Sequence, residues 1–409
     1  MPATQELGDL IVSENLTIHF QPIISLKQQA VVGLEALARP GSSPGCGPLN
    51  VLQLFRMAQE EKRLLELDRL CRRKALNTYR GLASLPEPKP LLFVNFEASV
   101  IDQGVEGSGA IRQAVKESGL SPEDVVIEIN ESRVVDSAGL KRFVDRHRDQ
   151  GFLIALDDLG TGESNLPRVA ALRPHILKLD RSLVAGIDGD YFKQETFKCL
   201  VSLGHGVGCL ILAEGVETQA EVDVCASLGA ELFQGFNFSR ALPADGLHLQ
   251  ALSPAIHAAG QRQRESAVKA IHARGAQALN MRRLSDTIRG TLVAAAAGSF
   301  DTVLERVVRT EPQVECAYML DHNGIQVTET HKSPFAALLT NRLFSPAPKG
   351  TDHSNKEYFY SLVDAKLERY ITENYLSLAT GRHCRTVSSL VDLPGGESYA
   401  LCLDLSADD

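Results

Sequence analysis

Residues 152–158 read FLIALDD, a short apolar run that ends in two adjacent aspartates, Asp157 and Asp158. A run without polar interruption is typical of a strand that is buried on both faces of its sheet. Seven further runs of this kind begin at residues 19, 31, 91, 125, 175, 209 and 231, and they read HFQPIISL, VVGLEALA, LLFVNF, VVIEI, HILKLD, CLILAE and ELFQGF. We therefore expect eight strands in this part of the chain.

Helix-like stretches separate most of the runs, and most runs carry a polar side chain at or near their ends. These residues are Glu35, Asn95, Glu128, Asp157, Asp158, Lys178, Glu214 and Gln234. Strands that alternate with helices predict an α/β fold, and polar strand ends predict an active site at one face of a TIM-like (β/α)8 barrel.

The polar residues are mostly carboxylates, which suit oxygen-liganded divalent metals and the metal-assisted hydrolysis of a phosphate ester. Carboxylates this close raise one another's pKa values unless cations intervene. An alternative is that the acids cap the helices that follow. That alternative is open for Asp158 alone, but it does not account for the whole set.

The same residues resemble the EAL family of bacterial phosphodiesterases, which linearise the second messenger cyclic di-GMP. Glu35, Ala36 and Leu37 form the signature tripeptide, and Arg39 follows it. The other family blocks occur in order at residues 20–23 (FQPI), 94–96 (VNF), 128–131 (EINE), 157–162 (DDLGTG), 178–180 (KLD), 213–218 (AEGVET) and 233–236 (FQGF). The resemblance covers residues 10–245.

The resemblance implies a two-metal site that holds Mg²⁺ or Mn²⁺, with Ca²⁺ as an inhibitory ion. It assigns the first metal to Glu35, Asn95, Glu128 and Asp157, and the second to Asp158. Catalytic roles fall on Lys178, Glu214, Asp158 and Glu217. Substrate contacts fall on Gln21, Glu35, Leu37, Arg39, Asp180 and Gln234. The implied substrate is cyclic di-GMP and the implied product is linear pGpG.

Asp157 to Gly162 continues into a loop that, by the resemblance, couples metal binding to dimerisation, and Glu131 matches the acid that holds this loop. Glu163-Ser164-Asn165 stands where the family usually has Tyr-Ser-Ser; this departure bears on the loop geometry, the dimer coupling and the turnover rate, and it removes no implied metal ligand. Two hypotheses follow: an active hydrolase, or a cyclic di-GMP receptor with little or no hydrolysis that signals through its C-terminal domain.

A net charge of −9 argues against binding to a nucleic-acid polymer or an anionic membrane. No apolar run approaches the roughly 20 residues that a membrane helix needs. The eight cysteines show no CxxC pairing, and several lie in apolar runs. We interpret them as reduced thiols rather than disulfides or zinc ligands, which predicts a cytoplasmic protein.

We expect three segments: an EAL barrel over residues 1–250, a helical connector over 251–299, and a regulatory domain over 300–409. Apolar residues at spacings of three and four in the connector suit a helix that pairs with its twin in a homodimer. They suit equally an amphipathic helix that lies on its own C-terminal domain. The choice stays open on sequence grounds.

Residues 300–409 predict an α+β domain with an antiparallel sheet. A hairpin is expected in CAYMLDHNGIQVTET (316–330), a helix at 356–366, and strands at 384–391 and 398–405. The segments 356–366, 370–391 and 399–405 resemble PAS-like and Cache sensor domains. Tyr358, Tyr375 and Arg385 are candidates for the pocket of an unknown ligand, and a protein partner is an alternative.

Overall fold

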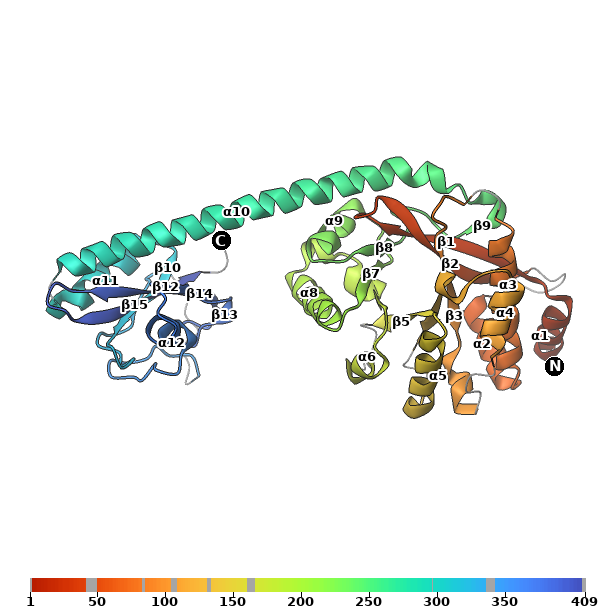
Figure 1. The fold of residues 1–409 in the computed structure, drawn as a ribbon, viewed down its shortest axis with the longest axis horizontal. Helices are drawn as coiled ribbons and strands as arrows, with labels where there is room; N and C mark the ends of the chain where they lie inside the picture. The colour runs from red at the N-terminus through yellow and green to blue at the C-terminus, as the bar shows by residue number, and fades with distance from the viewer. Residues whose placement is uncertain are drawn as a thin grey trace. The chain divides into compact units, whose positions relative to one another are not determined.

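The computed structural model describes residues 2–41, 50–82, 85–103, 109–130, 134–159, 166–295, 297–335 and 343–406. The chain forms two compact units, Met1–Val268 and Lys269–Asp409. Figure 1 shows the barrel strands with helices outside them in the first unit, and a sheet with helices against it in the second.

The first unit contains a closed barrel, which confirms the predicted fold class. Its strands are β1 (Leu16–Ser25), β2 (Ala30–Pro40), β3 (Leu91–Phe96), β4 (Val125–Ile129), β5 (Leu153–Leu159), β6 (Ile176–Leu179), β7 (Leu210–Glu214) and β8 (Leu232–Gln234). They pair in the order β2-β3-β4-β5-β6-β7-β8-β1, and β1 also pairs with β2 and so closes the ring. A short strand, β9 (Leu242–Pro243), adds to the other end of β1.

One strand departs from a regular TIM barrel. The strands β2 to β8 are parallel, but β1 is antiparallel to both of its barrel neighbours. Only residues 26–29 separate β1 from β2, and such a turn can join antiparallel strands but cannot make the crossover that parallel strands need.

Helices separate most of the barrel strands, as expected. They are α2 (Val51–Glu60), α3 (Leu64–Arg80), α4 (Ala110–Glu117), α5 (Ser137–Asp149), α6 (Leu166–Leu172), α7 (Arg181–Val184), α8 (Tyr191–Gly206) and α9 (Gln219–Ser227). The N-terminal helix α1 (Pro2–Ser13) was not expected; Leu7 and Leu10 bury it against the barrel core.

A layer of apolar side chains fills the barrel interior. Seven strands contribute one residue each: Ile23, Phe93, Val126, Ala155, Ile176, Leu212 and Leu232. The remaining strand, β2, places Gly33 at this level, where a Cβ would lie 2.5 Å from the Phe93 ring. This packed floor leaves the adjoining level of the interior for polar side chains.

The connector segment forms a single helix, α10 (Ser253–Ala294). Its first turns bury Ile256 and Ala259 in the barrel core. Its last turns bury Ile288 and Leu292 in the core of the second unit, as expected of an amphipathic helix that lies on its own domain. Between these ends Ile271 is 58% exposed.

The second unit is built on an antiparallel sheet. Its strands are β10 (Val314–Leu320), β11 (His331–Lys332), β12 (Arg369–Ile371), β13 (Tyr375–Leu376), β14 (His383–Asp392) and β15 (Ser398–Ser406). They pair in the order β11-β10-β15-β14-β12, and β13 also pairs with β14. The end of α10 and the helix α11 (Phe300–Thr310) pack on one face, and α12 (Glu357–Val363) packs on the other.

The predicted hairpin at 316–330 is wrong in its second strand. Residues 325–330 form no strand but make two isolated bridges, Leu320 with Gln326 and Ile325 with Asp352, and the strands that pair with β10 are β11 and β15. Thr328 is one reason, because its hydroxyl rather than its backbone accepts the Met319 N–H. No helix in the described part of the chain is long and apolar enough to cross a membrane.

Candidate active site

Strand alternation brings the predicted residues together above the apolar floor. Side chains two positions apart on a strand point to the same face. The residues two positions beyond the floor are Glu35, Asn95, Glu128, Asp157, Lys178, Glu214 and Gln234. On the antiparallel strand β1 the equivalent residue precedes the floor; it is Gln21, which lies opposite Glu35 in the register.

Lys178 lies at the centre of this group and is 1% exposed. Its Nζ lies 2.7 Å from Glu128 Oε1, 2.7 Å from Glu214 Oε1 and 2.9 Å from Asp157 Oδ1. Glu35 Oε1 is further away, at 3.9 Å. With every carboxyl ionised, the four carboxylates and the one ammonium carry a net formal charge of −3 (−4 + 1). The group therefore has too little positive charge to neutralise its acids.

Two amides donate to the Glu35 carboxylate, one to each oxygen. Asn95 Nδ2 donates to Oε1 at 3.2 Å, and Gln234 Nε2 donates to Oε2 at 2.5 Å. Gln234 also lies 3.3 Å from the Gln21 side-chain oxygen, and Gln21 in turn donates to the Ser239 carbonyl. Glu35 is thus oriented by neighbours on three strands.

Protonation of two of the carboxylates, Glu128 and Glu214, removes part of this negative charge. Burial, joined by the charge of Glu35, raises the pKa of Glu128 well above its usual range, and burial raises the pKa of Glu214 to about 8 despite Lys178. Burial would also raise the pKa of Glu35, but Lys178 and the two amides hold it below its usual range. The pKa of Lys178 is raised, because its carboxylate partners outweigh burial.

The donor set suits a divalent cation. Both oxygens of Glu128 and Oδ1 of Asp157 are buried, and the Lys178 ammonium contacts Glu128 Oε1 and Asp157 Oδ1. Oxygen donors that lack hydrogen are the ligands that Mg²⁺ and Mn²⁺ take.

The described side chains do not yet form a ready ligand set. Although the four carboxylates lie near one another, no three histidine, cysteine, aspartate or glutamate side chains among the described residues are placed so that they could hold one metal ion as they stand. The Lys178 ammonium lies among the acids, and the Asp158 side chain is outside the described part of the structure, although its backbone lies in β5. The backbone pairing of β5 with β6 shifts between Leu156 and Leu159, which interrupts the strict alternation at the two aspartates.

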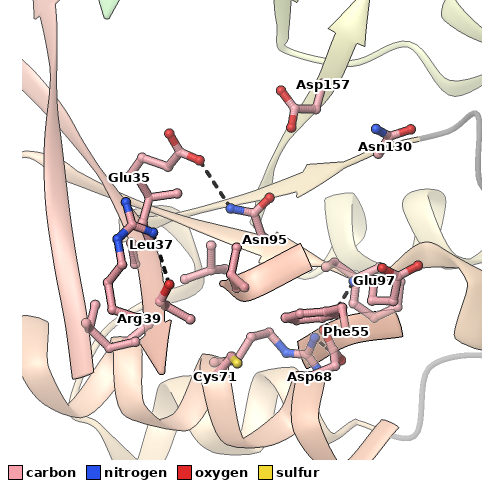
Figure 2. Close-up of a pocket in the computed structure, with 18 of the residues that line it drawn as sticks. Glu35, Leu37, Arg39, Phe55, Asp68, Cys71, Asn95, Glu97, Asn130 and Asp157 are labelled. Atoms are coloured by element: carbon pink, nitrogen blue, oxygen red, sulfur yellow. Dashed lines mark hydrogen bonds and ion pairs between the residues drawn. The ribbon is translucent and has the colours of Figure 1, made fainter. Parts of the chain in front are cut away.

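Two pockets open beside the cluster and share Glu35, Leu37 and Asp157. One, of about 270 Å³, contains Lys178 and reaches the exposed ring of Phe236; it also contains Gln21, Glu214, Glu217 and Gln234. The other, of about 310 Å³, contains Arg39 and Asn95 and extends to α2 and α3. Figure 2 shows the second pocket, with Glu35, Asn95 and Asp157 on one side and Phe55 and Asp68 on the other.

The remaining predicted residues lie at the edge of the site or outside it. Glu217 is exposed and pairs with Arg181 at 2.9 Å. Asp180 lines neither pocket and caps α7, where its Oδ1 accepts the Ser182 N–H at 2.8 Å. Glu131 and the loop at 160–165 lie outside the described residues.

A buried ion pair on α3 lines the second pocket and was not predicted. Asp68 is paired with Arg72 one helical turn later, and both are almost fully buried. Asp68 also accepts the Glu97 N–H at 3.1 Å, and the Arg72 guanidinium lies 5.1 Å from the centre of the Phe96 ring. A signal was present in LLELDRLCRRKAL: both charges fall on the face that carries the buried leucines.

Glu221 was also missed, although it holds the turn that carries Glu217. Its carboxylate accepts the backbone N–H groups of Gly186, Glu217 and Thr218 at 2.7–2.9 Å. The Thr218 hydroxyl accepts the Glu221 N–H in return, which completes a capping box. The spacing Thr-x-x-Glu at 218–221 is the known signal for this motif.

We expect Glu221→Gln to lower the free energy of unfolding by about 2 kcal/mol at neutral pH. The reason is that the NH₂ group of glutamine cannot accept a hydrogen bond and would replace one of the two oxygens that accept from the backbone. Burial would raise the pKa of Glu221, but the backbone donors hold it below its usual range. Its contribution is therefore present above the unfolded pKa of about 4.5 and is lost as the pH falls through the lower folded pKa.

Urea unfolding of wild type and variant at neutral pH and at acid pH measures this difference. Glu195 on α8, whose side chain is 44% exposed, is the matched control; changed to Gln, it should leave stability nearly unchanged. A wild-type-like Glu221→Gln protein at neutral pH would show that the turn is held by other contacts.

Comparisons with known proteins agree with this geometry. The family model "EAL domain" matches residues 4–241. "Cyclic di-GMP phosphodiesterase NbdA" of Pseudomonas aeruginosa is 28% identical over 246 residues, which are 58% of this chain and 30% of NbdA. The chain thus spans less than half the length of the curated relative.

Two solved structures extend the comparison. The Bacillus subtilis YkuI protein, with an EAL domain and solved with cyclic di-GMP and calcium, matches with a TM-score of 0.78 and 21% identity over 99% of each chain. Klebsiella pneumoniae BlrP1, solved with manganese and cyclic di-GMP, matches 56% of this chain and 57% of its own with a TM-score of 0.50 and 28% identity. The likeness to YkuI shows that the fold of both units has a precedent.

The family model, the order of the sequence blocks and the ring of polar side chains all refer to the same barrel. The matched residues, 4–241, make up more than half of the 409 residues. The chain belongs to the EAL-domain family.

Proposed function

We propose that this protein hydrolyses cyclic di-GMP to linear pGpG in a reaction that depends on a divalent metal ion. The observation that carries the proposal is the gathering of four carboxylates around Lys178 at one level of the barrel, between two open pockets. The name of NbdA and the manganese complex of BlrP1, each 28% identical to this chain, support the substrate class.

Glu35, Asn95, Glu128 and Asp157 would hold the first metal, and Asp158 would hold the second. Their oxygens supply the ligand chemistry that Mg²⁺ or Mn²⁺ requires, and those of Glu128 and Asp157 are buried beside a single cation, Lys178. When bound, such ions lower the pKa of a water molecule and withdraw charge from the phosphodiester. Ca²⁺ would bind the same oxygens without supporting turnover.

Lys178 and Glu214 are the residues that we propose to act on the phosphodiester and the attacking water. Both lie in the pocket of about 270 Å³, with the Lys178 Nζ 2.7 Å from Glu214. The Lys178 ammonium can donate to a phosphoryl oxygen as negative charge develops there. Burial raises the pKa of Glu214 to about 8 without metal, so this carboxyl is mostly protonated at neutral pH; it would accept a proton from water once bound cations lower that pKa. Glu217, at the edge of this pocket, would assist Lys178 and Glu214 in the reaction.

The substrate would lie across the two pockets, with its phosphate near Glu35 and Asp157. Gln21, Gln234, Leu37 and Arg39 line one pocket or the other and would contact it. Arg39 suits a phosphate or a guanine edge because its guanidinium donates in a planar fork. For Asp180, which caps α7, the contact with substrate stays a prediction.

We extend the proposal to the second unit as a regulatory domain and to a homodimer. The middle of α10 supports the dimer, because the apolar residues Val268, Ile271 and Leu279 are exposed there at helical spacing. We place the protein in the cytoplasm, since the cysteines in the described part of the chain are all unpaired.

Removal of the metal is the first prediction from this proposal. We expect treatment with EDTA to abolish hydrolysis of cyclic di-GMP, and Mn²⁺ or Mg²⁺ to restore it, because the carboxylate cluster lacks positive charge. Conversion is followed by chromatography of the nucleotide. Hydrolysis that persists after EDTA would contradict a metal-dependent mechanism.

The same samples separate the hydrolase from a receptor. Titration of cyclic di-GMP into protein with Ca²⁺ should show binding without product, and exchange to Mn²⁺ should then give pGpG. Tight binding that never yields product with Mn²⁺ or Mg²⁺ would favour the receptor alternative.

A further inference from the structure

The second unit contains a cavity that the EAL site does not account for. Its volume is about 550 Å³, which is within the range of about 300–1,000 Å³ that small-molecule sites occupy. It lies on the face of the sheet opposite α11, between β10, β15 and the segments 345–358 and 372–379. Two of the predicted pocket residues, Tyr358 and Tyr375, line it; Arg385 is not among the described lining residues.

A carboxylate lies at the base of this cavity. Asp404 on β15 is 3% exposed, and strand alternation places it on the same face as Cys402, which belongs to the cavity-side core. The Thr386 hydroxyl donates to its Oδ1 at 2.7 Å, and the Tyr375 hydroxyl lies 3.5 Å from the same oxygen. Burial raises the pKa of Asp404 to about 6, so the group is still mostly ionised at neutral pH.

Asp404 forms no ion pair within the described part of the chain, although other buried acids do. Glu315 on the neighbouring strand is equally buried and lies 3.4 Å from Arg382. In the barrel, Asp68 has Arg72 as its partner. A buried carboxylate without a cation is costly, and a cationic group that enters the cavity would repay that cost.

The rest of the lining favours a cation as well. The acids Asp352, Glu357 and Glu373 line the cavity with Asp404, against one lysine, Lys356, so the formal sum is −4 + 1 = −3. Burial lowers the pKa of His353, and its ring accepts from or donates to Tyr358 and Gln326, so His353 adds no charge at neutral pH.

Aromatic and apolar side chains complete the site. Tyr318 and Tyr358 pack edge to face with their ring centres 6.3 Å apart, and Tyr375 and Leu376 lie on the opposite strand β13. Tyrosine rings attract organic cations through their π faces and cover an apolar body at the same time. Free carboxylates on a ligand would meet the acidic lining and be repelled.

We infer that the second unit binds a small organic ammonium ion, with its charged group at Asp404 and its apolar part against Tyr318 and Tyr375. This site is separate from the barrel chemistry and does not rest on the proposed hydrolysis. Binding to it is measured without substrate or metal, so failure here and failure of the hydrolase are distinguishable.

The test uses the full-length protein and three probes of the same size and different charge. They are 2-phenylethylammonium, the neutral 2-phenylethanol and the anionic phenylacetate, with butane-1,4-diammonium as an aliphatic cation. Calorimetric titration at neutral pH should show saturable binding of at least one ammonium ion and weaker or no binding of the alcohol and the acid. Equal or tighter binding of the alcohol or the acid would overturn the inference, as would failure of both ammonium ions at millimolar concentration.

Asp404→Asn should weaken binding of the ammonium ion at least about 10-fold, since a charged hydrogen bond between ligand and protein is lost. Glu397→Gln removes an exposed acid outside the cavity lining and should leave binding unchanged. If Asp404→Asn does not fold, Glu373→Gln at the cavity edge gives a second variant, for which a several-fold loss is expected. Wild-type affinity in the folded Asp404→Asn protein would overturn the assignment.

Discussion

Glu35→Ala should lower the rate of cyclic di-GMP hydrolysis by at least about 10³-fold, because it removes a proposed metal ligand. Loss of a group that only supports a ligand costs about 10–100-fold, and Glu35 is placed to contact the metal directly. Three neighbours hold its carboxylate: Lys178 at 3.9 Å, Asn95 at 3.2 Å and Gln234 at 2.5 Å. Glu35 is therefore a proposed metal ligand, a lining residue of both pockets and the acceptor of both amides.

The fold should survive this change. Ala removes a buried charge together with the interactions that offset it, and the two amides can turn toward the open pocket. Steady-state kinetics with saturating Mn²⁺ and circular dichroism check both statements. Glu66→Ala, which removes an exposed acid on α3, is the control and should keep wild-type activity. Activity of Glu35→Ala within a few-fold of wild type would remove Glu35 from the metal site.

Lys178→Met should destabilise the metal-free barrel by about 3–5 kcal/mol, the range expected when one partner of a buried ion pair is removed. The ammonium is 1% exposed and lies within 3 Å of three carboxylates, which would lose their common cation. For a unit of this size the loss corresponds to a melting temperature lower by about 10 °C. Hydrolysis should fall by at least about 10²-fold, since a donor to the developing charge is lost.

The pH dependence of this variant has a definite sign. Without Lys178 the pKa values of Glu128 and Glu214 should rise further, because the attraction that lowers them is absent. A carboxyl whose pKa is higher in the folded than in the unfolded protein lowers the free energy of unfolding as the pH increases. The deficit of Lys178→Met should thus grow as the pH rises through about 8, the pKa of Glu214 in the wild type, because the carboxyl then ionises in the wild type but stays protonated in the variant. Lys198→Met on the surface is the control; an equal deficit there, or none at Lys178, would contradict the central role of this ammonium.

The sequence predicts much of the barrel because its strands are short apolar runs, each read within a few residues of its observed bounds. Alternation then places the site, since Phe93, Val126 and Leu212 form the floor and Asn95, Glu128 and Glu214 follow two positions later. The ring of polar side chains is a consequence of strand period and register, both of which are visible in the sequence.

Features that depend on packing between distant segments could not be predicted in the same way. Nothing local in residues 325–330 shows that a threonine hydroxyl would replace a strand hydrogen bond. The central position of Lys178 depends on four other strands. The burial of Asp404 without an ion pair to a described residue depends on which face of β15 meets the cavity. The apolar signal of the helix α1 is short, with Leu7, Leu10 and Ile11 at helical spacing, and burial of the two leucines in the barrel core holds it.

The most direct test of the account is a time course of cyclic di-GMP incubated with the purified full-length protein and Mn²⁺, separated by chromatography. We predict that linear pGpG appears as cyclic di-GMP disappears, that EDTA stops the conversion, and that Glu35→Ala does not support it. Cyclic di-GMP that remains intact with folded, Mn²⁺-loaded protein, or product that forms equally with Glu35→Ala, would contradict the proposed metal-dependent hydrolysis.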